Sequence, residues 1–333
     1  MEIFGIGLAF LTAIFTSAKD VFTNKAIKKI DEYLVAFAMS FIVIPLTIIP
    51  LWFMGFPEVG QKFWVALVFK APLIATTFIC IARAHKYSEM SLVVPLISFT
   101  PIFMLPLAPI IAGQHITQLG LLGVILIVLG VYILNIKEKG EEIDYDLGVK
   151  KRFEYLGPIK TIFSNKGSRY MFLVAFIYAF TSLLDARGVS GAGNNLRGAL
   201  FWTFWVDVCA SIILLPMAIK GWKKSKNEFS HNLSHMIPIG LCKGVAEIFQ
   251  MWAMALTLAI YVNSIKRTCI VMSVILALYI NKKERKGMKV KIIGAILAMI
   301  GFIFIVLSSR YTVADVLIGL KNALYDFQYY IPS

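Results

Sequence analysis

The fold of this chain is decided by the stretch Gly123-Val-Ile-Leu-Ile-Val-Leu-Gly130, which recurs as Gly294-Ala-Ile-Leu-Ala-Met-Ile-Gly301. Both stretches are apolar and begin and end with glycine, and the second follows the first by 171 residues. The same offset relates residues 82–84 (Ala-Arg-Ala) to residues 253–255 (Ala-Met-Ala), so the alignment between these positions needs no gap. Self-similarity at a fixed offset predicts a chain built from two structural repeats.

The composition is typical of a membrane protein with several spanning segments. Of the 333 residues, 59% are hydrophobic and only 16% are charged, and the mean hydropathy is +0.77. These values lie outside the usual range of soluble chains. A spanning helix needs about 20 mostly apolar residues. We predict ten such segments, near residues 3–25, 33–55, 63–84, 90–112, 117–136, 170–188, 197–219, 235–257, 260–281 and 289–308.

The order of these segments predicts two halves of opposite orientation. The polar residues 137–168 form a linker between a first repeat, residues 1–136, and a second, residues 169–309. Because each repeat has five spans, an odd number, the second must enter the membrane from the other side. The predicted fold class is an all-α integral membrane protein: ten transmembrane helices as two inverted five-helix repeats, with a C-terminal amphipathic helix in residues 310–333.

The net charge of +14 reflects membrane topology rather than a nucleic-acid surface, because the basic residues fall mainly in loops. Loops after the first, third, fifth, seventh and ninth segments carry most of them. By the positive-inside rule these loops are cytoplasmic, and both termini lie on the non-cytoplasmic side, with the cell membrane as the expected location. The first segment has no basic region before it and carries Lys19 and Asp20, so we expect a retained span.

Two adjacent cations, Lys266 and Arg267, lie inside the apolar ninth segment, with Asn263 on their shared side. A charge well inside a bilayer costs about 2.5–3.5 kcal/mol on insertion scales, so it needs a partner or a function. The repeat counterparts of the two residues are Pro95 and Leu96, so the repeat does not need the charges to fold. Either the pair binds substrate oxygens, or acidic residues of neighbouring spans neutralise it.

Other spans carry charges for which the sequence leaves two interpretations open. Lys19 and Asp20 share a polar face of the first span and either line a cavity or reach water near the cytoplasmic end. Lys243, Glu247 and Gln250 share a face of the eighth span. There, Lys243 and Glu247 either neutralise each other or form a proton or substrate-amine site.

Further polar candidates are Asp185 in the sixth span, Asp207 in the seventh, and Lys70, which either lines the cavity or snorkels. Cations inside the membrane exceed acids by one or two, and an anionic or zwitterionic substrate would balance this excess. The candidate substrate-binding residues are Lys19, Asp20, Lys70, Asp185, Asp207, Lys243, Glu247, Gln250, Asn263, Lys266 and Arg267.

The motifs that carry a family resemblance are Ala82-Arg83-Ala84, residues 91–95, the helix from Gly123 to Gly130, and the repeats of the first and last of these. They resemble the drug/metabolite transporter superfamily, in particular its EamA-type ten-helix branch. Gln114 stands where that branch usually has a loop glutamate, whereas Glu284 lies near the matching place in the second half. The Asn-x-x-Lys-Arg pattern of the ninth span is similar to that of plastid triose-phosphate translocators. That resemblance implies that Lys266 and Arg267 hold substrate phosphate.

No motif of the sequence predicts an enzyme, a cofactor or a metal site, since it contains no Walker A loop, no metal-ligand cluster and no nucleophile elbow. We therefore predict a secondary active or facilitative transporter of a small anionic or zwitterionic metabolite, phosphorylated ones included, working by alternating access. Its expected partners are that metabolite, the lipid bilayer, and either a coupling proton or a counter-substrate. A flippase for a phosphate-bearing lipid carrier and a membrane-embedded lipid-processing enzyme remain as alternatives.

Overall fold

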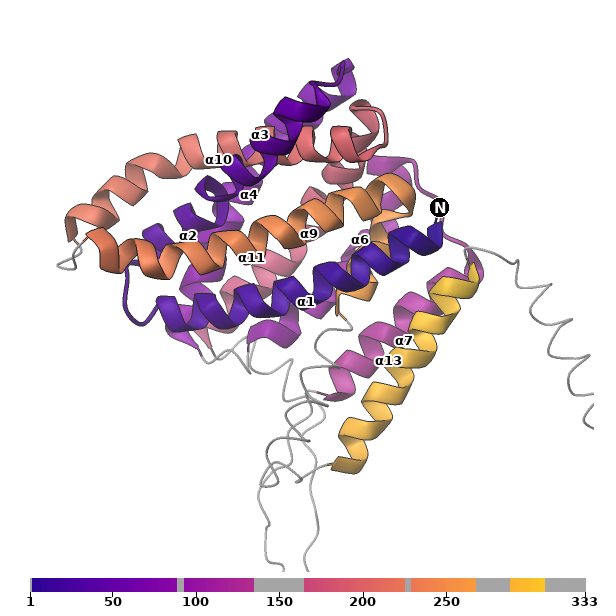
Figure 1. Ribbon diagram of the computed structural model, residues 1–333. Coiled ribbons are helices and arrows are strands. Elements are labelled where there is room, and N and C mark those ends of the chain that lie inside the picture. Colours follow the sequence, from indigo (N-terminus) through magenta and orange to yellow (C-terminus); the bar gives the residue numbers. More distant parts are fainter. Residues whose placement is uncertain (1, 89–92, 135–164, 225–228, 268–287, 309–333) are drawn as a thin grey trace, which may run out of the picture.

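The computed structural model describes residues 2–88, 93–134, 165–224, 229–267 and 288–308, and all regular secondary structure in these ranges is helical (Figure 1). The first half contains α1 (Glu2–Ala26), α2 (Glu32–Phe41), α3 (Val43–Met54), α4 (Gln61–Tyr87), the 3-10 helix η1 (Val94–Phe99), α6 (Thr100–Ala112) and α7 (Gln118–Leu134). The second half contains α9 (Lys166–Gly191), α10 (Leu196–Lys224), α11 (Phe229–Leu256), a helical segment at residues 259–267, and α13 (Met288–Ser308).

These helices occupy the described parts of the predicted apolar segments, with two differences. In the segment predicted over residues 90–112, the 3-10 helix η1 precedes α6. The segment predicted as one helix over residues 33–55 is divided at Ile42, the residue between α2 and α3. Pro45 explains the break, because it has no amide hydrogen for the carbonyl four residues earlier and its ring crowds that carbonyl. The linker, the C-terminal tail and residues 268–281 of the ninth segment lie outside the described residues.

Six helical segments of the described chain are long and apolar enough to cross a membrane. They are Phe4–Ala26, Glu32–Met54, Gln61–Tyr87, Lys166–Gly191, Leu196–Lys224 and His231–Leu256. The segments Leu96–Ala112, Gln118–Ile133 and Ile293–Ser308 are apolar but shorter. The length and composition of these helices therefore indicate an integral membrane protein.

The distribution of side chains is that of a protein surrounded by lipid. On α4, Val68 and Phe69 are 69% and 62% exposed, whereas the next residue, Lys70, is only 2% exposed. Large apolar side chains such as Trp52 and Ile212 are also exposed. A soluble protein would place these residues the other way round, so the outer surface suits hydrocarbon and the interior holds the charges.

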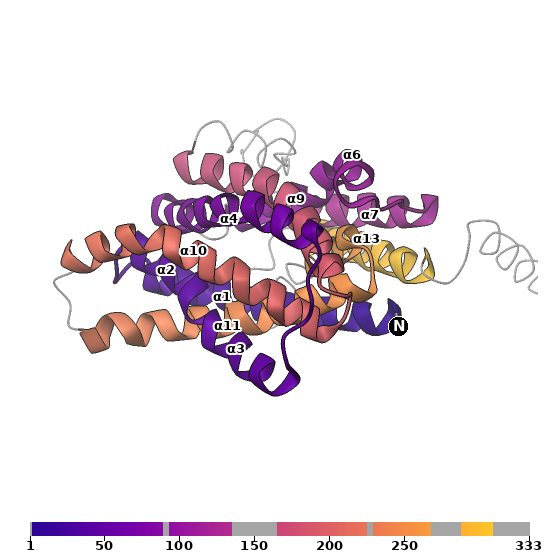
Figure 2. The same cartoon turned by 90° about the horizontal axis from the view of Figure 1, so that it is seen from above.

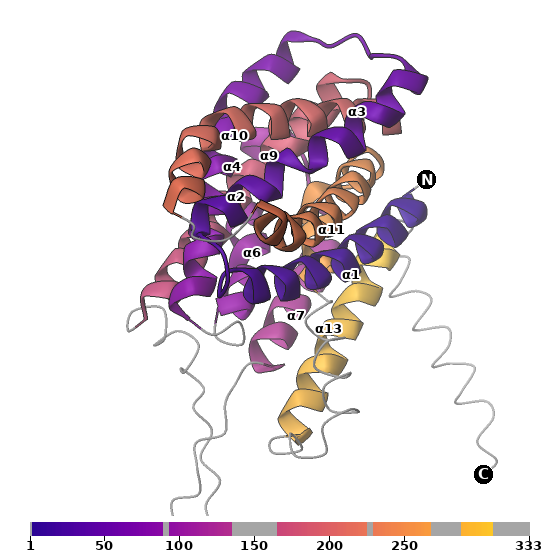
Figure 3. The same cartoon turned by 60° about the vertical axis from the view of Figure 1, so that its left-hand side comes forward.

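Helices from the two halves pack against each other in a reciprocal pattern. In the core of the bundle, α1 packs along α11 and α4 packs along α9 (Figure 2). The last described helices of the halves, α7 and α13, lie side by side away from the rest (Figures 1 and 3). Further large contacts join α10 to α2 and α3, and α6 to α9. Neither half therefore packs as an isolated unit.

The two glycine-bounded stretches contact each other where α7 meets α13. A Cβ atom on Gly130 would lie 2.5 Å from the carbonyl oxygen of Gly294, and one on Gly301 would lie 2.6 Å from that of Gly123. Only glycine permits backbones to approach so closely, as in other membrane helix pairs. The repeated glycines thus allow the close contact between α7 and α13.

The hydrogen bonds between helix ends identify the two ends of the bundle. At one end, Glu32 at the start of α2 accepts hydrogen bonds from Arg83 and Lys86 at the end of α4, and Ser88 donates to Asn165. We call this the basic end, because it carries Lys25, Lys28, Lys29, Arg83, Lys86, Lys220, Lys223 and Lys224. At the far end the Gly60 amide donates to the Gly191 carbonyl, and the Ala259 amide donates to Gln114.

The glycine contact predicts the effect of adding one methyl group. Gly130→Ala places a Cβ against the backbone of α13, so we expect a loss of about 1–3 kcal/mol of stability, typical of overpacking. The thermal unfolding midpoint in detergent measures this loss. Gly7→Ala is the matched control, since a Cβ there meets nothing within 4 Å and alanine favours helix by up to about 1 kcal/mol. Equal midpoints for the two variants would contradict the proposed close contact.

Candidate functional site

A cavity lies in the middle of the bundle, between α1, α4, α9, α11 and the helical segment at residues 259–267. Its volume is about 50 Å³, room for one or two waters at about 30 Å³ each. The side chains that line it are Thr16, Lys19, Met39, Lys70, Ile74, Phe78, Tyr178, Thr181, Ser182, Asp185, Lys243, Ala246, Glu247, Gln250, Asn263, Lys266 and Arg267. Nine of the eleven predicted site residues are in this list, and Asp20 and Asp207 are not.

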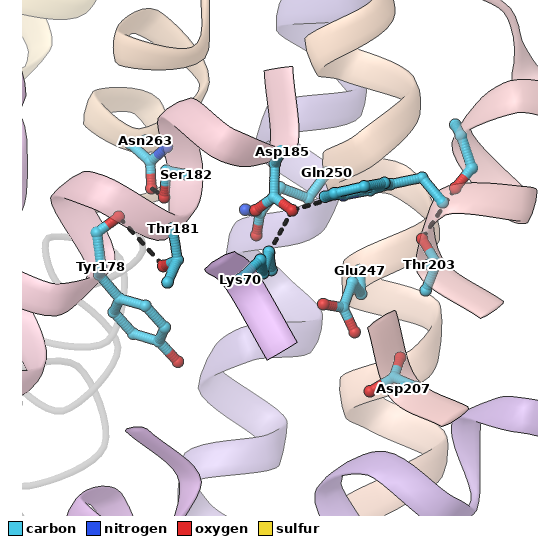
Figure 4. Close-up of polar contacts among 12 residues, drawn as sticks. Lys70, Tyr178, Thr181, Ser182, Asp185, Thr203, Asp207, Glu247, Gln250 and Asn263 are labelled. Carbon is cyan, nitrogen blue, oxygen red and sulfur yellow. Dashed lines mark hydrogen bonds and ion pairs between the residues drawn. The ribbon is translucent and has the colours of Figure 1, made fainter. Parts of the chain in front are cut away.

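One buried ion pair joins the two halves across the cavity. The ammonium of Lys70 on α4 points to the carboxylate of Asp185 on α9 and pairs with it (Figure 4). Both residues are 2% exposed, so Lys70 does not snorkel, and that alternative is wrong. A pair at this depth is sustained by mutual attraction together with further hydrogen bonds.

Trp202 on α10 supplies such a further hydrogen bond. Its indole Nε1 donates to Asp185 Oδ1 at 2.6 Å. The ring fits against Gly188, where a Cβ would lie 2.3 Å from it, and Phe63 contacts it edge to face at 5.2 Å between ring centroids. The sequence analysis missed this residue, because a tryptophan in an apolar span resembles ordinary core and its contact with Gly188 depends on helix packing.

A second buried cluster lies beside the first and contains two acids for one base. Lys243 on α11 pairs with Glu247 one turn later and with Asp207 on α10, which accepts a hydrogen bond at 2.6 Å. Glu247 lines the cavity, whereas Asp207 is 0% exposed and lies behind Lys243. The interpretation of Lys243 and Glu247 as a self-neutralised pair was therefore incomplete, because Asp207 shares the lysine.

On α1, Lys19 and Asp20 form an ion pair at 2.7 Å between Lys19 Nζ and Asp20 Oδ1. Each residue is 7% exposed. Lys19 lines the cavity and Asp20 does not. The alternative that both reach water at the basic end is wrong in this structure.

Lys266 has a different environment from these three lysines. Its Nζ donates to the amide oxygen Oε1 of Gln250 at 2.6 Å. Nearby, Asn263 Oδ1 accepts from Ser182 at 3.4 Å, and Arg267 lines the same cavity at 6% exposure (Figure 4 shows Asn263, Ser182 and Gln250). The four acids proposed as neutralising partners, Asp20, Asp185, Asp207 and Glu247, each pair with Lys19, Lys70 or Lys243.

Neutral polar residues that the sequence analysis did not propose complete the lining. Thr16, Tyr178, Thr181 and Ser182 all border the cavity. The repeat contains a signal that could have found two of them, because Thr16 and Thr181 are related by an offset of 165 residues. Hydroxyl groups both donate and accept hydrogen bonds, so these side chains can orient a polar ligand without adding charge.

A larger pocket of about 560 Å³ lies at the far end, between α6, α9 and α11. Lys62 and Arg187 contribute the only charged side chains to its lining, among the described residues, and Gln114 and Asn194 add amide groups. Ala186, which also lines it, directly follows Asp185 of the central cavity. Adjacent residues of α9 therefore line the cavity and the far-end pocket.

The buried pair predicts unequal effects of single and double neutralisation. Lys70→Met leaves the Asp185 carboxylate buried without its ammonium, so we expect a loss of about 3–5 kcal/mol. Adding Asp185→Asn removes that charge and should restore much of the stability, as measured by thermal midpoints in detergent. Lys62→Met, an exposed lysine on the same helix, is the control and should change little. A double variant as unstable as the sum of the single variants would contradict the pairing.

Comparison with known proteins adds three findings. Residues 3–136 match the EamA-like transporter family. No curated protein matches the chain. A solved structure described as "Crystal structure of protein" is similar over 92% of this chain and 98% of its own, with a TM-score of 0.64 and 12% sequence identity. At this identity the likeness concerns the fold alone.

The match over residues 3–136 supports the predicted place in the drug/metabolite transporter superfamily. The resemblance to triose-phosphate translocators is not tested by these findings and stays a prediction. With the six long apolar helices, the family match supports a membrane transporter of small substrates, similar over residues 3–136 to the EamA-like transporter family.

Proposed function

We propose that the protein transports a small anionic or zwitterionic metabolite, phosphorylated metabolites included, by secondary active or facilitative alternating access. One observation carries this proposal: Lys266 lines a buried cavity and donates to an amide oxygen, while the neighbouring acids pair with other lysines. Lys266 is only half-buried, but a cation beside a neutral acceptor inside a spanning bundle is still costly. A bound anion would remove that cost.

The charge balance of the cluster supports the same conclusion. Its cations are Lys19, Lys70, Lys243, Lys266 and Arg267, and its acids are Asp20, Asp185, Asp207 and Glu247. Counted over the part of the chain that the structure describes, and with every group ionised, the cluster carries one excess positive charge. A monoanion would make it neutral, whereas a cationic substrate would add to the excess.

The two basic residues differ in what they offer a ligand. Arg267 carries a planar fork of donors that suits carboxylate or phosphate oxygens, whereas Lys266 supplies a compact charge. Gln250, Asn263 and Ser182 add neutral hydrogen-bonding groups on the same wall. We propose these five residues as the anion-binding part of the site, and the remaining cavity charges as the framework that holds it.

Alternating access follows from an inverted-repeat arrangement, which we propose for the whole chain: ten spans, with residues 1–136 and 169–309 as the repeats. The reciprocal packing of α1 on α11 and of α4 on α9 supports it, because each pair joins the first span of one half to the third of the other. The cavity of about 50 Å³ is far smaller than typical ligand pockets of about 300–1,000 Å³. Substrate binding therefore requires the halves to move apart.

The two ends of the bundle differ, as expected for one state of an alternating-access cycle. At the basic end Arg83 pairs with Glu32 and donates to the Tyr33 hydroxyl at 3.0 Å, which fastens α4 to α2. At the far end lies the pocket of about 560 Å³. We propose that the basic end is cytoplasmic, that both termini face the other side, and that substrate reaches the cavity from the far end in this state.

A thermal-shift screen tests the proposed substrate class, because a ligand that binds the folded state raises the unfolding midpoint. The probes are inorganic phosphate, 3-phosphoglycerate, succinate and serine, with glucose and spermidine as uncharged and cationic controls. We expect an anionic or zwitterionic probe to raise the midpoint and spermidine to leave it unchanged. The Lys266→Met variant should fold but show no rise in the unfolding midpoint with that probe.

Lys220→Met is the matched control, because this lysine is exposed at the basic end of α10. It should retain the wild-type shift. Stabilisation by spermidine alone, or a full anion shift in Lys266→Met, would contradict the proposal.

A further inference from the structure

The cluster of Asp207, Lys243 and Glu247 has one carboxylate more than it has ammonium groups. Lys243 is in contact with both acids, and it also lies over the ring of Phe78 at 4.8 Å. Asp207 is fully buried, and its second oxygen, Oδ2, has no hydrogen-bond partner. Two buried carboxylates that share one cation leave a negative charge, and a proton held between them would remove it.

Among the described residues, the lysines that α1 and α4 place at the cavity pair with acids other than Asp207 and Glu247. Of the charges facing it, Lys70 from α4 pairs with Asp185 from α9, and Lys19 and Asp20 from α1 pair with each other. Lys266 and Arg267 lie across the cavity on the helical segment at residues 259–267. The other packed elements, α2 and α3, carry no ionisable side chain beyond Glu32 and Tyr33 at the basic end.

From this geometry we propose that Asp207, Lys243 and Glu247 form a proton-binding site whose occupancy is coupled to the substrate, so that proton and anion travel together. This inference rests on the proposed transport function and names its coupling ion. Glu247 lines the cavity, whereas Asp207 is fully buried and does not, so a proton from the cavity reaches Glu247 first. No bond other than the carboxyl O–H is made or broken.

The coupling follows from the charge that the cavity presents. With both acids ionised, the ammonium of Lys243 pairs with two carboxylates. The full set of five cations and four acids described in and around the cavity then carries one excess positive charge. A proton on one of these two acids raises the excess to two positive charges, and Lys243 then pairs with only one carboxylate. The site then attracts an anion more strongly, and by linkage a bound anion strengthens proton binding to the same extent.

Reconstituted vesicles test the coupling separately from transport. Radiolabelled inorganic phosphate, 3-phosphoglycerate and succinate serve in turn as probes, first in exchange without a pH gradient and then in net uptake with the outside more acidic. We expect exchange of at least one probe, faster net uptake with the gradient, and acidification of the lumen reported by a trapped pH dye. Affinity for that probe should rise by up to about tenfold per unit fall in pH, the limit for one linked proton.

In Glu247→Gln and Asp207→Asn the amide cannot take the proton, so the gradient should no longer drive uptake or acidify the lumen, although exchange stays above that of empty vesicles. Glu58→Gln, an exposed acid far from the cavity, should behave as wild type. If the wild type exchanges a probe but the pH gradient does not change its net uptake, the coupling is overturned and the transport proposal stays intact. Gradient-driven uptake that persists in both variants, each of them folded, would overturn the coupling in the same way. Exchange of no probe would overturn both proposals, and wild-type data alone decide the matter if the variants do not fold.

Discussion

Every charge at the centre of this bundle must be compensated there, because the helices around it face lipid with apolar side chains. The pair of Lys70 and Asp185 meets this constraint by joining α4 of the first half to α9 of the second, with Trp202 of α10 holding the carboxylate. Lys243 meets it by joining α11 to α10 through Asp207. The same bonds that neutralise the interior therefore set the positions of four helices around the cavity.

Small residues make that arrangement possible. Trp202 can reach Asp185 because Gly188 leaves room for its ring, and α7 can lie against α13 because Gly123, Gly130 and Gly301 leave room for the backbone of the facing helix. In a membrane the hydrophobic effect does not press helices together, so close contact and interior polar bonds must do so. In the described chain, glycine contacts hold α7 against α13 at the periphery, and ion pairs hold the helices together at the centre.

Much of the fold could be predicted from the sequence, because apolar segments of spanning length and repeated glycines are local signals. The break at Ile42 could have been found from Pro45. The site was predicted as a set of nine charged and two amide residues, and nine of the eleven line the cavity. Which acid pairs with which base could not be predicted, because Lys70 and Asp185 lie 115 residues apart in the chain and meet only through helix packing. Trp202 gave no signal for the same reason.

These pairings leave Lys266 beside a neutral partner, and the account depends on that residue. The most direct test is a structure of the protein crystallised with selenate, a phosphate-like anion whose position is fixed by anomalous scattering. The account predicts a selenate peak within hydrogen-bonding distance of Lys266 Nζ and the Arg267 guanidinium. Selenate bound only in the far-end pocket near Lys62 and Arg187, with the central cavity unchanged, would contradict it.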